Sequence, residues 1–166
     1  PRSALVYPGQ VIWEGTNLSE GRGTTQPFEL FGAPFLDPEA VLDLLDISDL
    51  GGVILRPIEF EPTAQKWAGQ RCRGVQMHVS DAATFRPYRT SLRLLQVISH
   101  LYPDDFQWKQ PPYEYEYVKQ PIDLILGDRA LRQALVEQTP LTTLEALWAP
   151  ALAEYETLIG PVRIYS

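Results

Sequence analysis

The sequence predicts an α+β or α/β fold in which a single domain, spanning residues 1–166, carries a mixed β-sheet flanked by helices. Two patterns indicate this fold. Apolar and polar residues alternate over 53–61 and 75–79, as they do in strands with one buried face. Apolar residues recur at helical spacing over 87–102. With 166 residues and 45% hydrophobic side chains, the chain is long enough to bury a core of its own.

The first expected strand is the short apolar run at 11–13, which the chain enters through a Tyr-Pro-Gly turn at 7–9. The next element is a helix that begins near Pro38, because Asp37 can cap it and proline suits the first helical turn. The two glycines at 51–52 predict the end of this helix.

Two strands and the clearest helix occupy the middle of the chain. The strand at 53–61 follows the paired glycines, and the strand at 75–79 places His78 on its polar face. Pro87 then opens the helix that extends to Tyr102, where a Pro-Asp-Asp sequence ends it.

The last third of the chain has a more mixed pattern. Tyrosines alternate with glutamates over 113–117, which predicts an extended piece that is either an edge strand or a long loop. Its tyrosines either cover the core or stack on a sugar. Asp128 can cap a short helix, and Thr142 with Glu145 forms a capping box for the last helix. A closing strand is expected at 162–165.

Charge and composition exclude several kinds of partner. The net charge of −7 argues against binding to a nucleic acid backbone, which needs clustered lysines and arginines. No run of about 18 apolar residues occurs, so no membrane span is expected. His78 and His100 have no histidine or cysteine neighbours at ligand spacing, and Cys72 is the single cysteine. No metal site and no cofactor are predicted.

The most informative stretch is the polar loop at 13–25, which carries two carboxylates, a guanidinium and three glycines. The glycines permit close backbone approach, so several amides could point at one oxygen-rich ligand. The loop has neither the Gly-Lys-Ser/Thr of a Walker loop nor a dinucleotide fingerprint. Glu14, Glu20 and Arg22 suit a sugar ring or an anionic substituent. Alternatively, Glu20 and Arg22 pair with each other while neighbouring polar side chains satisfy the turn backbone.

The stretch 14–29, which reads EGTNLSEGRGTTQPFE, resembles the C-terminal half of the NamZ-type exo-β-N-acetylmuramidases, a family long catalogued only as a domain of unknown function. Further matches include Lys-Trp-Ala-Gly at 66–69, the segment 72–79 and Phe-Gln-Trp at 106–108. The resemblance therefore covers almost the whole chain.

The resemblance implies an activity and a missing partner. Members of the family remove terminal N-acetylmuramic acid from the non-reducing end of peptidoglycan fragments. They carry a Rossmann-like domain ahead of the matched stretch, and that N-terminal domain holds the proposed catalytic carboxylate. No residue of this chain matches that carboxylate, so no catalytic residue is assigned and the isolated domain is expected to be inactive.

Within the family, the chain is expected to be the C-terminal domain that forms one wall of the substrate cleft. The implied partners are the N-terminal Rossmann-like domain, which should dock on the face bearing the 14–25 loop, and muropeptide or glycan fragments. The resemblance also favours a periplasmic or secreted location. The alternative function is a noncatalytic module that binds cell-wall saccharide or protein through the same loop.

The candidates for contact with substrate are Glu14, Thr16, Asn17, Glu20, Arg22, Thr24, Lys66 and His78. Arg22 is the only cation of the loop and therefore the best candidate to bind the lactyl carboxylate of N-acetylmuramic acid. Lys66 either meets that carboxylate or is a solvated lysine, and His78 either contacts ligand or is a hydrogen-bonded structural residue. Glu14 and Glu20 are expected to position substrate or to support the acid of the partner domain.

Overall fold

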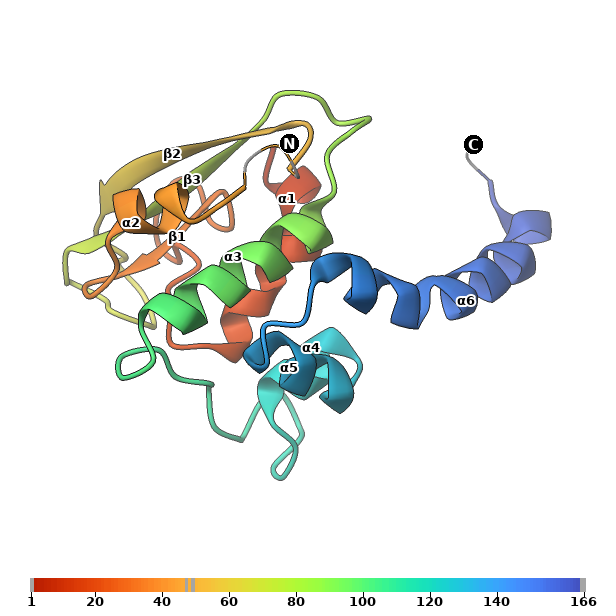
Figure 1. The fold of residues 1–166 in the computed structure, drawn as a ribbon. Helices are drawn as coiled ribbons and strands as arrows, with labels where there is room; N and C mark the ends of the chain where they lie inside the picture. Colours follow the sequence, from red (N-terminus) through yellow and green to blue (C-terminus); the bar gives the residue numbers. More distant parts are fainter. Residues whose placement is uncertain (1, 47, 49, 165–166) are drawn as a thin grey trace.

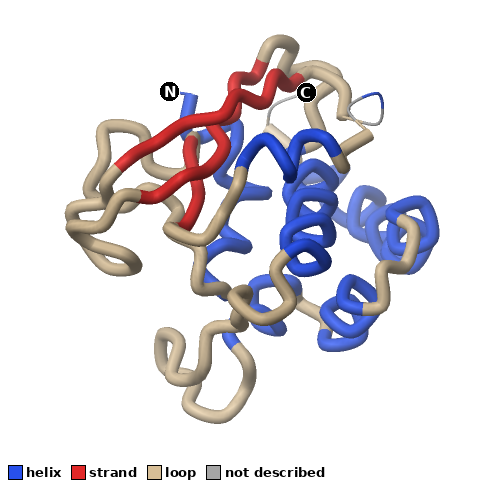
Figure 2. The backbone as a smooth tube through the Cα atoms, turned by 60° about the vertical axis from the view of Figure 1, so that its left-hand side comes forward, coloured by secondary structure: helices blue, strands red, loops and turns tan. Residues whose placement is uncertain are grey.

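The computed structural model describes residues 2–46, 48 and 50–164. Over these residues the protein has an α+β fold, in which a three-stranded sheet lies to one side of a group of helices (Figure 1). A view turned by 60° shows the same separation of strands and helices (Figure 2). The predicted fold class is confirmed in its α+β form, because all strand pairs are antiparallel.

Strand β3 (Cys72–Val79) forms the centre of the sheet, between β1 (Leu30–Ala33) and β2 (Val53–Phe60). The two strands predicted from alternation are therefore confirmed as β2 and β3. Gly32 of β1 lies opposite Gly74 of β3. A Cβ atom on Gly74 would lie 1.9 Å from the carbonyl oxygen of Phe31, so only glycine permits the two backbones to approach this closely.

The N-terminal segment is helical, so the strand expected at 11–13 is wrong. Helix α1 (Arg2–Gln10) includes the residues of the expected turn, and the 3₁₀ helix η1 (Val11–Gly15) follows it directly. The ring of Trp13 is buried and stacks on Phe31, with the ring centroids 4.4 Å apart. The apolar run is thus a buried helical turn, which a short hydrophobic segment does not distinguish from a buried strand.

Helix α3 (Pro87–Leu101) is the central helix of the fold and confirms the helix expected at 87–102. It packs against α1, and it presents five buried aliphatic side chains to the core, those of Leu92, Leu94, Leu95, Val97 and Ile98. A Cβ atom on Gly9 would lie 2.1 Å from the carbonyl oxygen of Pro87, so the glycine of the expected turn instead permits close packing of α1 on α3.

Hydrogen bonds satisfy the polar side chains buried between α1 and α3. The amide of Gln10 donates through Nε2 to Oγ of Ser91 at 2.7 Å, and its Oε1 accepts from Nε1 of Trp13 at 2.8 Å. A buried polar group without such partners would destabilise the fold. This chain of bonds fixes the point at which α1 passes into η1, directly before the polar loop.

Helix α2 (Pro38–Asp43) begins where the sequence predicts it. The carboxylate of Asp37 accepts a hydrogen bond from the backbone of Glu39 at 3.2 Å, and Pro38 occupies the first turn. The helix is shorter than expected, because it ends at Asp43 rather than just before Gly51.

Three helices follow α3 in sequence, namely α4 (Pro121–Leu126), α5 (Arg129–Val136) and α6 (Leu141–Ile159), and the 3₁₀ helix η3 (Gly160–Val162) is the last helical element of the described chain. Asp128 caps α5 as predicted, by accepting from the backbone of Ala130 at 2.7 Å.

Two predictions near the C-terminus are wrong. Pro140 rather than Thr142 occupies the N-cap of α6, and no side chain makes a capping bond there. Proline fits this position because the φ of −53° there is close to the value that its ring imposes. The strand expected at 162–165 is absent from its described part, since Val162 ends η3 and 163–164 are not in a strand. Tyr165 lies outside the described residues.

Helix α6 projects away from the rest of the molecule (Figure 1). Leu141 and Leu144 are its buried residues. Beyond them the expected apolar face is present but uncovered, with Leu147 61% exposed and Leu158 69% exposed. An exposed apolar surface of this kind is typical of a site of protein contact. Among the helices of the described residues, none has the length and apolar character needed to cross a bilayer.

Candidate functional site

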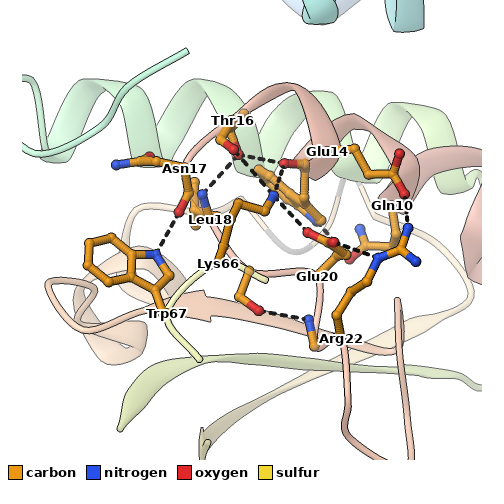
Figure 3. Close-up of polar contacts among 12 residues, drawn as sticks. Gln10, Glu14, Thr16, Asn17, Leu18, Glu20, Arg22, Lys66 and Trp67 are labelled. Atoms are coloured by element: carbon orange, nitrogen blue, oxygen red, sulfur yellow. Dashed lines mark hydrogen bonds and ion pairs between the residues drawn. The ribbon is translucent and has the colours of Figure 1, made fainter. Parts of the chain in front are cut away.

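The charged residues of the polar loop form a network of ion pairs, which we call the Glu14–Lys66 cluster; it comprises Glu14, Glu20, Arg22 and Lys66 (Figure 3). Glu20 is only 1% exposed. Its Oε1 accepts from Nε of Arg22 at 3.1 Å, and its Oε2 lies 2.7 Å from Nζ of Lys66. Arg22 also donates through Nη2 to Oε1 of Glu14 at 2.7 Å. The alternative interpretation of the loop, in which Glu20 pairs with Arg22, is thus confirmed.

Lys66 connects the cluster to the end of η1, so its interpretation as a solvated lysine is wrong. Its ammonium donates to the carbonyl oxygens of Trp13 at 2.7 Å and of Thr16 at 3.2 Å. Cations are stabilised at such carbonyl-rich helix ends. Burial lowers the pKa of Lys66, and the nearby carboxylate of Glu20 only partly offsets that effect.

Arg22 remains accessible while it pairs with both carboxylates. Its side chain is 41% exposed, and its guanidinium carbon lies 5.9 Å from the ring centroid of Phe28. Burial acts to lower the pKa of Arg22, but the hydrogen bonds with Glu14 and Glu20 outweigh it and raise the pKa. The guanidinium is therefore firmly charged, and two carboxylates already neutralise it.

Tyr113 completes the hydrogen bonding of Glu14. Its hydroxyl donates to Oε2 of Glu14 at 2.8 Å, so each oxygen of this carboxylate has a donor. Burial, together with that bond, raises the pKa of Tyr113. Nζ of Lys109 lies 5.2 Å from the centroid of the tyrosine ring, a cation–π contact.

The segment around Tyr113 is a loop, as one of the two sequence interpretations predicts. Tyr113 and Glu116 bond to each other through both backbone groups, at 2.9 and 3.0 Å, which makes a tight turn. The tyrosines of 113–117 therefore do not share one side, because Tyr113 faces Glu14 whereas Tyr115 is 92% exposed.

A cavity of about 160 Å³ opens beside the cluster, and the side chains that give it its chemistry are Glu14, Glu20, Arg22, Lys66, Lys109 and Tyr113. Carboxylates, cations and an aromatic ring around one hollow suit a small polar ligand that carries both hydroxyls and charge. Lys109 and Tyr113 were not among the predicted site residues. No short sequence spacing points to them, because each reaches the cluster from far along the chain.

A second hollow, of about 640 Å³, lies between the start of α3, α5 and α6, where Tyr88 packs edge-to-face on Trp148. Its volume is larger, but its walls are mainly apolar, with Leu131, Leu147 and Leu152 among them. We place the candidate site at the smaller cavity because the titratable groups converge there.

The hydroxyls of two predicted site residues, Thr16 and Thr24, bond to backbone groups of neighbouring residues in the loop. Oγ1 of Thr16 donates to the carbonyl oxygen of Trp13 at 2.9 Å and accepts from the amide of Leu18 at 3.1 Å. Oγ1 of Thr24 donates to the carbonyl oxygen of Gly21 at 2.6 Å. Both hydroxyls stabilise turns of the loop, which is the alternative that turn chemistry predicts.

Asn17 attaches the loop to the segment that follows α3. Its side chain donates to the carbonyl oxygen of Asp105 at 2.8 Å and accepts from the amide of Gln107 at 3.1 Å. The indole of Trp67 donates to the carbonyl oxygen of Asn17 at 2.6 Å (Figure 3). Much of the loop is therefore buried in this chain's own fold, and its exposed side begins at Arg22.

His78 does not join the cluster. It lies on β3 opposite Ile54 and lines a separate hollow of about 170 Å³ with Arg2 and Glu29. Among the residues that the structure describes, none makes a hydrogen bond with its imidazole. In the same part of the chain, no three His, Cys, Asp or Glu side chains are placed to hold a metal ion.

Comparison with known proteins identifies relatives over nearly the whole chain. The profile of the family described as "Exo-beta-N-acetylmuramidase NamZ, C-terminal" matches residues 5–165. A curated protein from Bacillus subtilis (strain 168), the peptidoglycan beta-N-acetylmuramidase NamZ, is 45% identical over 106 residues. That match covers 64% of this chain but only 26% of the relative.

Two crystal structures of DUF1343 family proteins from Bacteroides fragilis NCTC 9343 share the fold. The first superposes with a TM-score of 0.79 at 23% identity and covers 98% of this chain. The second has a TM-score of 0.64 at 18% identity and covers 99% of this chain. The chain spans 42% and 41% of those proteins, so each of them extends well beyond the shared fold.

Proposed function

This chain belongs to the family of C-terminal domains of the exo-β-N-acetylmuramidase NamZ, and on that premise we propose that it forms one wall of the substrate cleft of a peptidoglycan-degrading exo-β-N-acetylmuramidase. The reaction of such an enzyme is hydrolysis of the glycosidic bond that holds a terminal N-acetylmuramic acid. The observation that supports this role is the cavity beside Glu14, Arg22, Lys109 and Tyr113, which offers acceptors, cations and a ring to an acidic sugar.

In the proposed enzyme, the carboxylates of Glu14 and Glu20 do not transfer a proton to the substrate. Glycoside hydrolysis usually requires a carboxylic acid that protonates the leaving oxygen. Glu14 already accepts from Arg22 and Tyr113, and Glu20 is enclosed by Arg22 and Lys66. Glu14, whose side chain is 15% exposed, can still accept bonds from sugar hydroxyls, whereas Glu20 is buried beneath the two cations, so the acid must come from the rest of the full-length protein.

The partner that supplies this acid is, in our proposal, an N-terminal Rossmann-like domain of the same protein. Two observations support a further domain. The relatives extend well beyond the matched region, and α6 presents the uncovered side chains of Leu147, Leu152 and Leu158. We propose that the N-terminal domain packs against this face of α6 in addition to the face that bears the 14–25 loop, where its acid is needed. Exposed apolar rims of this kind are typical where a neighbouring domain docks.

The test compares the full-length protein with the 166-residue chain on a chromogenic N-acetylmuramide and on muropeptides that end in N-acetylmuramic acid. The full-length protein should release the sugar, and the chain alone should not. Turnover by the chain alone that Glu14→Gln abolishes would instead make Glu14 a catalytic carboxylate.

The alternative function is a noncatalytic module that binds cell-wall saccharide or protein, and the exposed face of α6 is the observation that favours it. This alternative is supported if the full-length protein binds muropeptides without cleaving any of them.

A further inference from the structure

Three cations line the cavity of the Glu14–Lys66 cluster, and they differ in how far their charge is already neutralised. Arg22 lies within 3.1 Å of two carboxylates, and Lys66 lies 2.7 Å from a third carboxylate oxygen. Lys109 is exposed and, within the described part of the chain, makes no ion pair. Its ammonium is therefore the cation of the cavity that is available to an anionic ligand.

The backbone of Lys109 is fixed close to Glu14. The amide of Lys109 donates to the carbonyl oxygen of Gly15 at 2.9 Å, and Trp108 pairs with Thr16 in an antiparallel bridge. The side chain then extends over the ring of Tyr113, at 5.2 Å from its centroid. The ammonium, the ring and the Glu14 carboxylate thus form three neighbouring parts of one wall.

The positive charge of Lys109 acts electrostatically on Lys66, a member of the cluster. Burial is the main reason why the pKa of Lys66 is lowered, and the charge of Lys109 lowers it further. An anion bound at Lys109 would reduce this repulsion between cations. An anion bound at Arg22 would instead approach the carboxylates of Glu14 and Glu20, which repel it.

We propose that Lys109 determines the specificity of this cavity by binding the carboxylate of an acidic amino sugar, whereas Arg22 positions Glu14. In the muramidase proposed above, on which this inference rests, that carboxylate is the lactyl group that distinguishes N-acetylmuramic acid from N-acetylglucosamine. Glu14 accepts hydrogen bonds from the sugar, and the ring of Tyr113 offers the sugar an apolar contact. This proposal differs from the sequence expectation that Arg22 binds the lactyl group.

The experiment measures kcat/KM of the full-length protein on matched chromogenic N-acetylmuramide and N-acetylglucosaminide substrates. Lys109→Met should lower kcat/KM for the muramide about tenfold or more, mainly through KM, and so narrow the preference for the muramide over the glucosaminide. Lys109→Arg keeps the charge and should retain the preference. Arg22→Lys should lower both rates alike, because it disturbs Glu14. Lys119→Met, at an exposed lysine outside the cavity, is the matched control.

An unchanged preference in Lys109→Met would overturn the inference while leaving the muramidase proposal intact. A preference lost in Arg22→Lys but kept in Lys109→Met would return the role to Arg22. If the wild-type protein cleaves neither substrate, calorimetric titration with free N-acetylmuramic acid and N-acetylglucosamine separates the two proposals. If the wild-type protein binds the acidic sugar and Lys109→Met does not, the role of Lys109 is supported and only the proposed hydrolysis is refuted. If both proteins bind it equally, the role of Lys109 is refuted as well.

Discussion

The hydroxyl of Tyr113 donates a 2.8 Å hydrogen bond to the carboxylate of Glu14, which lies 99 residues earlier in the chain. Arg22 bonds to the other oxygen of the same carboxylate. Glu14 is therefore held from two sides, by Arg22 of its own loop and by Tyr113 of a segment that is distant in sequence. Its position depends on the loop at 109–117 as much as on its own helix η1.

Tyr113→Phe should lower the free energy of unfolding by about 1 kcal/mol, because it removes one hydrogen bond to a largely buried carboxylate. Urea denaturation of the chain measures this difference. The matched control is Tyr115→Phe, whose ring is exposed, and it should change stability by less than about 0.5 kcal/mol. Equal effects of the two substitutions would show that the bond does not stabilise the fold.

Glu20→Gln should destabilise the chain by about 3 kcal/mol, because it leaves the buried ammonium of Lys66 without its carboxylate. The double variant Glu20→Gln/Lys66→Met should be more stable than the single variant, since it removes the unpaired charge. Denaturant titrations of both variants and of Lys66→Met give the coupling energy. Strictly additive effects would mean that the two side chains do not interact.

Tyr88 should make the stability depend on pH above pH 10. Burial, with a smaller contribution from Asp128, raises the pKa of Tyr88 from 10.0 to about 12. Between these values the folded chain holds a proton that the unfolded chain has released, so the free energy of unfolding falls as pH rises. Tyr88→Phe should reduce this fall by on the order of 1 kcal/mol, because solvent screens the partly exposed ring.

Melting curves of wild type and Tyr88→Phe between pH 9 and about pH 12 test this prediction, since the difference between the two proteins cancels the other titrating groups. Parallel curves would show that the hydroxyl of Tyr88 titrates alike in the folded and unfolded chain.

Gly74→Ala should destabilise the sheet by about 3 kcal/mol or prevent folding, because its Cβ would lie 1.9 Å from a backbone oxygen of β1 that cannot move aside. Gly51→Ala is the control, because a Cβ atom there would lie 3.6 Å from its nearest neighbour, which is an ordinary van der Waals contact. It should change the free energy of unfolding by less than about 0.5 kcal/mol. Circular dichroism and thermal melting of both variants decide between these outcomes.

Elements with one buried face were predictable from the sequence, and elements buried on all sides were not. Polar residues alternate with apolar ones in β2, and apolar residues form one stripe along α3, because one face of each element meets solvent. The apolar run at 11–13 has no such pattern, since Ile12 and Trp13 are both buried, and a buried run of this length fits a strand or a helix equally well. Strand β1 is hidden for the same reason, because all four of its residues are buried.

The candidate site was predictable only in its local part. Glu14, Glu20 and Arg22 lie within one loop, and their pairing follows from charge and proximity. The contributions of Lys109 and Tyr113 depend on the path of the chain after α3, which no periodicity in the loop encodes. The sequence also predicts that Arg22 binds an anion, and the ion pairs of Arg22 with both carboxylates are the reason why we propose Lys109 for that role instead.

The distance in sequence between Glu14 and Tyr113 also orders events during synthesis. The segment that bears Glu14 and Arg22 leaves the ribosome first, and it can form its ion pairs while Tyr113 is still untranslated. Closing a contact over 99 residues costs more chain entropy than closing a local loop, and such contacts form late in folding. A nascent chain that ends before residue 113 therefore carries the charged residues of the site without the ring of Tyr113. The site becomes complete only when most of the domain has been synthesised.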